Sequence, residues 1–256
     1  MCGLAGFIGF SKKPYISKLL ISKLFEKSER RGTDAAGFWG IDNKGNTFYY
    51  KEPISSSFFI KKDIWQETVS QDLNLVIVHA RGASKGVGLP IYNENNHPFI
   101  SFDENIGLIH NGRIDDKEYF DLKDNFKLLG DCDSELLIRI YESSEKYLED
   151  YSLKRLKGIK DIFNLLVESH MAVAVGEKLN EKRFLWLFRN EYRPLWTIDL
   201  EEDLNQIFFV SDPSFWFESI EECNFMPKHQ KVQELVAGEI WEINNYLEIK
   251  KYKNYP

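Results

Sequence analysis

A cysteine occupies position 2, directly behind the initial methionine, in the run MCGLAGFIGF. If Met1 is removed, Cys2 carries a thiol and a free α-amine on one residue. A thiol with a pKa of about 8.5 needs a base to become a nucleophile, and an α-amine with a pKa of about 7.7–8.0 can serve as that base. N-terminal threonine hydrolases combine two such groups in the same way. Cys2 is therefore a candidate nucleophile, and the alternative is a small buried hydrophobic residue.

The segment LIHNGRIDD, residues 108–116, places Asn111 and Gly112 where an apolar strand is expected to end. A side-chain amide beside an unhindered backbone N–H offers two donors that could converge on one developing oxyanion. The alternative is an ordinary Asn-Gly turn. The pattern thus indicates either an oxyanion hole or a turn.

Two further segments place a charge at the end of an expected element. Arg81 ends a buried strand in VHARGASKG, where its guanidinium could hold a carboxylate through charge-assisted hydrogen bonds worth about 1.5–3 kcal/mol each. Asp133 precedes a helix in GDCDSELL and could bind a substrate ammonium group. The alternatives are an internal salt bridge for Arg81 and a helix cap for Asp133. Arg31, in the turn RRGTDAAG, indicates little alone.

The elements that must position these residues follow from the hydrophobic pattern. Residues 14–31 predict an amphipathic helix behind a proline, and residues 38–51 predict a hairpin that turns at 43–46. Apolar runs without polar alternation predict strands covered on both faces. These runs are LNLVIVHA, ENIGLIH, HMAVAVGE, RFLWLFRN and QIFFVS. Two helices are expected within residues 133–150 and 152–169, and residues 83–99 form the longest irregular stretch, a candidate lid.

Composition narrows the class of protein. The chain has 256 residues, 43% of them hydrophobic, and we expect one folded domain over 1–256. A formal net charge of −7 disfavours nucleic acid as a direct partner. The chain has no apolar run long enough to cross a membrane, and its three cysteines match neither a zinc site nor a disulfide framework. We therefore expect a cytoplasmic protein that uses no metal and no cofactor.

Taken together in one order, the motifs resemble a class II glutamine amidotransferase domain of the N-terminal-nucleophile kind. Such domains occur in amidophosphoribosyltransferase, glucosamine-6-phosphate synthase and asparagine synthetase. The resemblance runs from Cys2 to about residue 245. It is carried by Cys2, R-G-x-D-x-x-G at 31–37, H-x-R-x-x-[ST]-x-G at 79–86, H-P-F at 97–99, H-N-G at 110–112 and D-x-E at 133–135. The chain has Gly82 and Lys85 where the glucosamine-6-phosphate synthase branch carries Trp and His.

The resemblance implies an α+β fold, a four-layer αββα sandwich of two antiparallel sheets known as the N-terminal nucleophile hydrolase fold. In this fold Cys2 attacks the glutamine carboxamide, while Asn111 and the Gly112 amide stabilise the oxyanion. Arg81 holds the α-carboxylate of L-glutamine and Asp133 its α-amine. The resemblance also implies two residues that line the site, Arg31 and Ser84. We expect His79 and His110 to be hydrogen-bonded structural groups.

Fused relatives of this kind continue into a synthase or transferase domain, whereas the present sequence stops at Pro256. We therefore expect a stand-alone glutaminase that supplies ammonia to a separate synthase or amidating enzyme. One alternative is an independent hydrolase of γ-glutamyl or other amides, since the same nucleophile serves any amide that fits. A second alternative is a catalytically silent interaction module, which the intact Cys2, Asn111 and Arg81 argue against.

Overall fold

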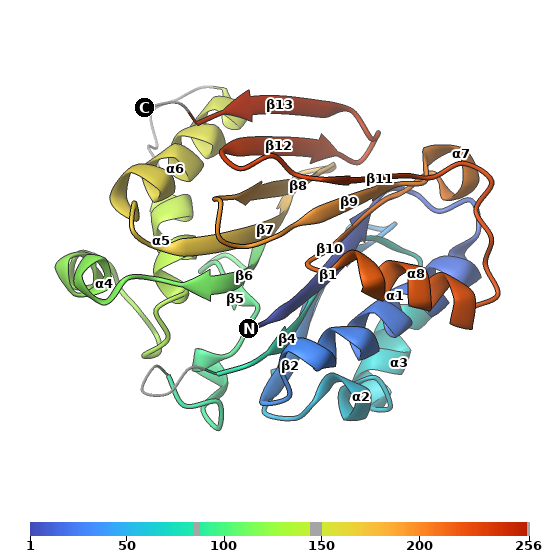
Figure 1. Cartoon of the computed structure of the whole chain (residues 1–256), viewed down its shortest axis with the longest axis horizontal. Helices are drawn as coiled ribbons and strands as arrows, with labels where there is room; N and C mark the ends of the chain where they lie inside the picture. The colour runs from blue at the N-terminus through green and yellow to red at the C-terminus, as the bar shows by residue number, and fades with distance from the viewer. Residues whose placement is uncertain (84–87, 144–149, 255–256) are drawn as a thin grey trace.

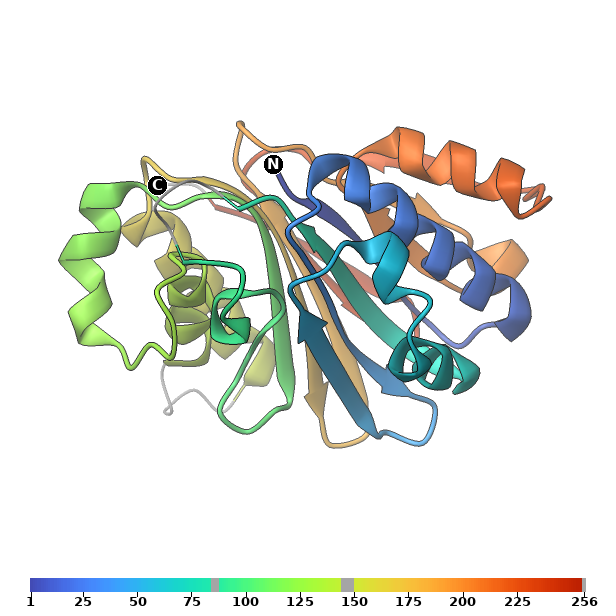
Figure 2. The same ribbon diagram turned by 90° about the horizontal axis from the view of Figure 1, so that it is seen from below.

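The computed structural model describes residues 1–83, 88–143 and 150–254. Two antiparallel sheets face each other in the middle of the molecule, and helices cover the outer face of each (Figures 1 and 2). The layers are therefore helix, sheet, sheet and helix. This arrangement confirms the predicted αββα sandwich. No helix within the described ranges has the length and apolar character that a membrane crossing requires.

The first sheet has the strand order β11-β9-β10-β1-β4-β2-β3, and all of its pairs are antiparallel. Its strands are β1 (Gly3–Ile8), β2 (Ala35–Asp42), β3 (Thr47–Glu52), β4 (Leu73–Arg81), β9 (Trp196–Asp199), β10 (Ile207–Val210) and β11 (Lys231–Glu234). β1 and β4 are buried along their whole length, as their mostly apolar runs without polar alternation predicted. Gly3 lies opposite Ala80, so the register brings the start of β1 beside the end of β4.

The second sheet has the order β13-β12-β8-β7-β6-β5 and is also antiparallel. Its strands are β5 (Phe99–Ile100), β6 (Ile106–Arg113), β7 (His170–Leu179), β8 (Lys182–Arg189), β12 (Glu239–Asn244) and β13 (Ile249–Lys253). The expectation that the strand ends at Asn-Gly was wrong. β6 continues to Arg113, because Asn111 and Gly112 stay paired with Ala172 and Met171 of β7.

The outer helices fall into two groups (Figure 2). The first sheet is covered by α1 (Pro14–Ser28), α2 (Ser56–Phe59), α3 (Asp63–Ser70), α7 (Glu201–Leu204) and α8 (Pro213–Glu222). The second is covered by α4 (Asp116–Leu122), α5 (Glu135–Ser143) and α6 (Tyr151–Leu165). Short 3₁₀ helices occur at η1 (Glu29–Arg31), η2 (Asn93–Asn95) and η3 (Lys123–Asn125). Two expectations need correction: residues 29–31 leave the α-helix, and the stretch expected to be irregular contains η2.

The inner faces of the sheets form a separate apolar core. Trp39 of β2 is fully buried there and packs against the facing sheet. A Cβ added at Gly107 or Gly176 would overlap the Trp39 ring, so glycine allows the indole to lie flush with β6 and β7. Burying a large apolar side chain contributes about 1.5–3 kcal/mol, and this core therefore fixes the two sheets against each other. The ends of β1, β4 and β6 consequently meet at one end of the sandwich.

Candidate active site

A pocket of about 380 Å³ opens where the ends of β1, β4 and β6 meet. Residues from both sheets and from the segment before α5 line it: Cys2, Arg81, Gly82, His97, His110, Gly112, Arg113, Cys132, Asp133 and Ser134. Four of the predicted site residues thus line one pocket: Cys2, Arg81, Gly112 and Asp133. They lie as many as 131 positions apart in the chain, from Cys2 to Asp133, and tertiary structure alone unites them.

Cys2 is buried just ahead of β1, with its thiol at the pocket wall. Its Sγ lies 3.7 Å from the carbonyl oxygen of Gly82, and its backbone N–H donates to Oδ1 of Asn111 over 3.0 Å. Burial raises the pKa of the thiol, although the Gly82 hydrogen bond and the nearby Arg81 charge act in the opposite sense. The thiol therefore needs a base to become a nucleophile.

Asn111 and Gly112 both present donors beside Cys2. Nδ2 of Asn111 is buried and has no hydrogen-bond partner among the described residues. Met171, opposite Gly112, uses its own N–H and C=O on Asn190. In an antiparallel pair of strands, two opposite residues that do not bond to each other both point their N–H groups away from the partner strand. The Gly112 N–H therefore points to the edge of β6 along which β5 lies.

Arg81 is buried, and its guanidinium is held by the segment that leads into η2. Nη1 donates to Oδ1 of Asn96 over 2.7 Å, and Nη2 donates to the carbonyl oxygen of Gly88 over 2.7 Å. Asn96 is itself fully buried, and its Nδ2 donates to the carbonyl oxygen of Pro90. The arginine is thus fixed in direction by the described part of the stretch that was expected to form a lid.

Asp133 also lines the pocket and is half-buried. Its Oδ2 accepts a hydrogen bond from the backbone N–H of Ile114 over 2.9 Å, just beyond β6. Its Oδ1 accepts from the Ser134 hydroxyl over 3.2 Å. The carboxylate is therefore fixed between β6 and α5. The pocket places a cation, Arg81, and an anion, Asp133, on its wall.

Three buried histidines pack beside the pocket. His79 stacks on His97 with ring centroids 3.9 Å apart, and the centroid of His110 lies 6.4 Å from that of His97. Burial lowers the pKa of His79 to about 3 and that of His97 well below its ordinary value. Burial also lowers the pKa of His110, whose ring contacts Ser134 Oγ and the carbonyl oxygen of His170. All three rings are therefore neutral and weakly basic near pH 7. His79 and His110 are hydrogen-bonded, as expected.

Of the remaining two predicted residues, Arg31 and Ser84, the structure describes only Arg31. Arg31 lies at the edge of the site, where it donates to the carbonyl oxygen of Ser211 over 2.9 Å and contacts the Met1 sulfur at 3.5 Å. Burial lowers the pKa of Arg31, while the Asp212 charge raises it. Ser84 lies outside the described residues, as does Lys85.

Three residues that had not been predicted from the sequence touch the predicted groups: Asn96, Cys132 and Ser134. A signal for Cys132 and Ser134 was present, because they flank Asp133 in GDCDSELL. Burial raises the pKa of Cys132 to about 12, so its thiol is the less reactive neighbour. In the described ranges no group of three or more His, Cys, Asp and Glu side chains is arranged to hold a metal ion.

Comparison with known proteins gives sequence relatives over most of the chain. No protein-family model matches it. A glutamine–fructose-6-phosphate aminotransferase (isomerizing) of Staphylococcus epidermidis is 30% identical over 197 residues, which cover 75% of this chain and 29% of the relative. The Staphylococcus aureus enzyme of the same name is 29% identical over 180 residues, which cover 69% and 27%. The chain thus spans less than a third of the length of these curated relatives.

A solved structure of similar fold is the glutamine phosphoribosylpyrophosphate amidotransferase of B. subtilis. It matches with a TM-score of 0.68 at 19% identity and covers 99% of this chain and 49% of its own. This likeness supports the N-terminal-nucleophile type of sandwich. On its sequence similarity and its fold, the chain belongs to the class II glutamine amidotransferase domains.

Proposed function

We propose that the chain hydrolyses the side-chain amide of glutamine through a thioester on Cys2. The observation that carries the proposal is the state of the Asn111 amide beside the thiol. Its Oδ1 is occupied by the Cys2 N–H, and its Nδ2 is a buried donor without a partner among the described residues. A buried unpaired donor is costly, and an oxyanion that forms beside it would satisfy it.

In the proposed reaction, Sγ of Cys2 attacks the carboxamide carbon and a C–S bond forms. The carbonyl electrons move to oxygen, where Asn111 Nδ2 and the Gly112 N–H donate to the negative charge. The thiol proton passes to the α-amine of Cys2 and then to the departing nitrogen, so that ammonia leaves. Water then cleaves the thioester to give glutamate and restores the thiol. The neutral, weakly basic histidines favour the amine over an imidazole as base.

Charge on the pocket wall supports glutamine over simple amides as substrate. Arg81 and Asp133 offer opposite charges to the α-carboxylate and α-ammonium groups of an amino acid. Each would form charge-assisted hydrogen bonds in a partly desolvated site. Arg31 and Ser84 are proposed to line the same site. An amide without the amino-acid head would make neither of these contacts and so bind less tightly.

The ammonia is proposed to serve a separate synthase or amidating enzyme. The names of the relatives support transfer of the amide nitrogen, since they act as a fructose-6-phosphate aminotransferase and a phosphoribosylpyrophosphate amidotransferase. We propose that glutamine turnover by the chain alone is low and rises when the partner enzyme binds.

The test is glutamate release from glutamine by the purified chain, with and without a co-purifying enzyme and its substrate. Cys2→Ala should abolish release, whereas Cys223→Ala, in the partly buried cysteine that ends α8, should leave it unchanged. Cleavage of another γ-glutamyl amide in place of glutamine would instead favour an independent amide hydrolase. Release that no partner alters would contradict the coupling to an acceptor.

A further inference from the structure

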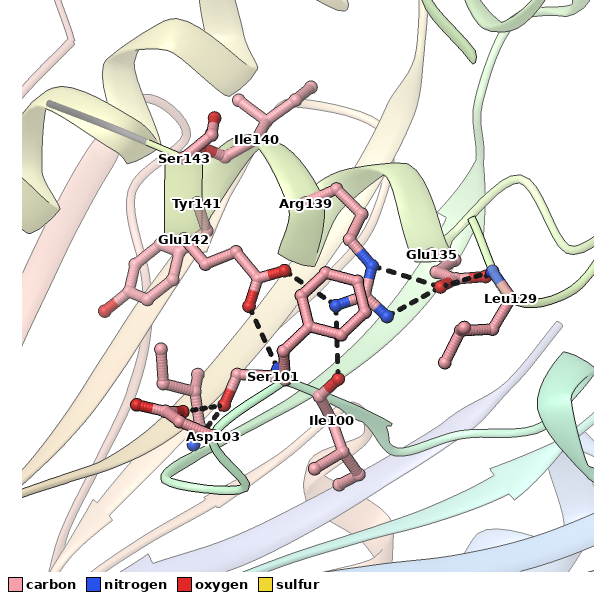
Figure 3. A network of polar contacts seen from close by, with 12 residues as sticks. Ile100, Ser101, Asp103, Leu129, Glu135, Arg139, Ile140, Tyr141, Glu142 and Ser143 are labelled. Atoms are coloured by element: carbon pink, nitrogen blue, oxygen red, sulfur yellow. Dashed lines mark hydrogen bonds and ion pairs between the residues drawn. The ribbon is translucent and has the colours of Figure 1, made fainter. Parts of the chain in front are cut away.

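The segment that carries Asp133 into the pocket is tied to a buried carboxylate on the helix that follows. Glu135, the first residue of α5, accepts the backbone N–H of Leu129 over 2.9 Å (Figure 3). It also accepts the backbone N–H of Gly130 over 3.0 Å. Both donors belong to residues 129–133, which have no strand or helix of their own. The Glu135 carboxylate therefore supplies the hydrogen-bond acceptors that a neighbouring strand would otherwise supply to this backbone.

Arg139, one helical turn further on, completes the contacts of Glu135. Its Nε and Nη2 donate to Oε1 over 3.1 and 2.7 Å. The side chains are only 3% and 1% exposed, so both charges have lost nearly all of their water. A buried ion pair recovers this desolvation cost only where further hydrogen bonds satisfy both partners, and it is weak evidence for stability by itself. The pair thus calls for a role beyond stability.

The other branch of the guanidinium reaches the second sheet. Nη1 of Arg139 donates to Glu142 over 2.7 Å and to the carbonyl oxygen of Ile100, at the end of β5, over 3.3 Å (Figure 3). The Phe102 ring lies against the guanidinium, with its centroid 4.1 Å from the central carbon. Arg139 is therefore held by contacts on three sides, and its hydrogen bonds to Glu135 orient the Glu135 carboxylate.

A second contact holds the same segment from η2. Oδ1 of the buried Asn95 accepts the backbone N–H of Asp131 over 2.7 Å. Asn95 ends η2, directly before the Asn96 amide that orients Arg81. The segment with the anion and the segment that holds the cation are thus joined. The spacing of the two pocket charges depends on residues 129–133 keeping one conformation.

We propose that Glu135, held by Arg139, is a positioning residue that sets the preference of the pocket for substrates with an α-ammonium group. This inference rests on the proposed glutaminase function. Glu135 is not among the residues that line the pocket. It fixes residues 129–133 so that the Asp133 carboxylate meets the ammonium group of glutamine. A purely structural role, in which Glu135 only supports the first turn of α5, makes a different prediction, because it would lower stability without changing selectivity.

The test compares glutamine with glutaramate, which keeps the carboxamide and the carboxylate but lacks the α-amine. Glu135→Gln keeps the size of the side chain and loses its charge, and Arg139→Met removes the group that orients it. Each should raise the KM for glutamine about tenfold, the size of one charge-assisted contact, with kcat changed much less. The Ki of glutaramate, as a competitive inhibitor, should stay within about twofold of wild type.

The matched control is Glu177→Gln, since Glu177 is equally buried and pairs with Arg155 over 2.8 Å at the other end of α5. It should lower stability without raising the ratio of KM to Ki. Amide hydrogen exchange of residues 129–131 should accelerate in Glu135→Gln and not in the control. An equal shift of the ratio in Glu177→Gln, or an unchanged ratio in a folded Glu135→Gln, would overturn the positioning role. A wild-type chain that releases no glutamate would instead overturn the proposed function.

Discussion

The backbone N–H of Cys2, just before β1, donates to Oδ1 of Asn111 in β6 over 3.0 Å, although the two residues are 109 positions apart and belong to different sheets. The bond decides how the Asn111 amide is used. Because the amide oxygen Oδ1 faces the Cys2 N–H, the amide nitrogen Nδ2 faces the other way as a buried donor. The nucleophile and the proposed oxyanion donor therefore fix each other, so a change at either residue acts on both.

Asn111→Ala should lower kcat for glutamate release by about 10²–10³ and change KM little, because the lost donor acts on charge that develops during reaction. Asn244→Ala, at the last residue of β12, is the control and should leave kcat at the wild-type value. Steady-state kinetics on both variants distinguish the two results. A folded Asn111→Ala protein with wild-type kcat would exclude the amide from the oxyanion hole.

Active protein should lack Met1, because the peptide nitrogen of Cys2 is not a base while an acyl group is attached to it. Met1 also covers part of the site: its backbone packs against Gly82, and its sulfur contacts Arg31. Intact mass spectrometry on fractions of known specific activity checks this. Full activity in fractions that retain Met1 would point to a Cys–His mechanism through His79 or His110 instead.

The strands that could be predicted are those whose burial leaves a pattern in sequence. β1, β4 and β7 are mostly apolar and mostly buried because layers cover both of their faces, and each was expected. β13 was not, since it is an edge strand with four of its five residues exposed and no apolar run. The order of strands in each sheet depends on contacts between distant segments, which local periodicity does not encode.

The same division applies to the site. Cys2, Arg81 and Asp133 could be selected because each stands beside an expected element in a motif with chemical meaning. Asn96 and Arg139 could not, because their role lies in contacts to backbone and side chains that only packing brings near. The charged residues of the pocket could be predicted from the sequence, whereas the Asn96 amide and the Glu135–Arg139 ion pair that support them could be found only in the structure.

Arg81→Lys should raise the KM for glutamine more than it lowers kcat, since it keeps the charge but loses the planar fork that a carboxylate needs. It also breaks one of the two contacts with Asn96 and Gly88 that direct the side chain. Arg30→Lys is a suitable control, because Arg30 is exposed and pairs with Glu218 on α8. Unchanged kinetics in a folded Arg81→Ala variant would remove this residue from substrate binding.

Gly112→Ala should destabilise the fold by about 1–3 kcal/mol, the usual cost of forcing extra atoms into a packed region. A Cβ at this position would overlap the carbonyl oxygen of His170 and the ring of His110, so either β7 or the histidine must move. Gly40→Ala is the control within a strand, where the nearest atom would be 3.0 Å from the new Cβ. Thermal unfolding of both variants gives the comparison, and equal melting temperatures would contradict the predicted overlap.

The three neutral histidines should make the protein less stable as the pH falls below about 6.5. Burial lowers the pKa of His79 to about 3, and the pKa values of His97 and His110 are lowered for the same reason. Between the unfolded value of about 6.5 and the folded value, the unfolded chain binds a proton that the folded chain does not. The free energy of unfolding therefore decreases as the pH is lowered, by up to about 1.4 kcal/mol per pH unit for each histidine.

Carboxylates add to the acid sensitivity of any protein, so the decisive measurement is a difference between variants. His97→Gln removes one of the buried imidazoles, and its free energy of unfolding in urea should fall less steeply than that of wild type between neutral pH and about pH 5. His229→Gln changes a histidine that is 65% exposed and should keep the wild-type slope. Equal slopes in all three proteins would mean that His97 takes up a proton inside the folded chain. The stack with His79 would then have to tolerate a charge that its burial disfavours.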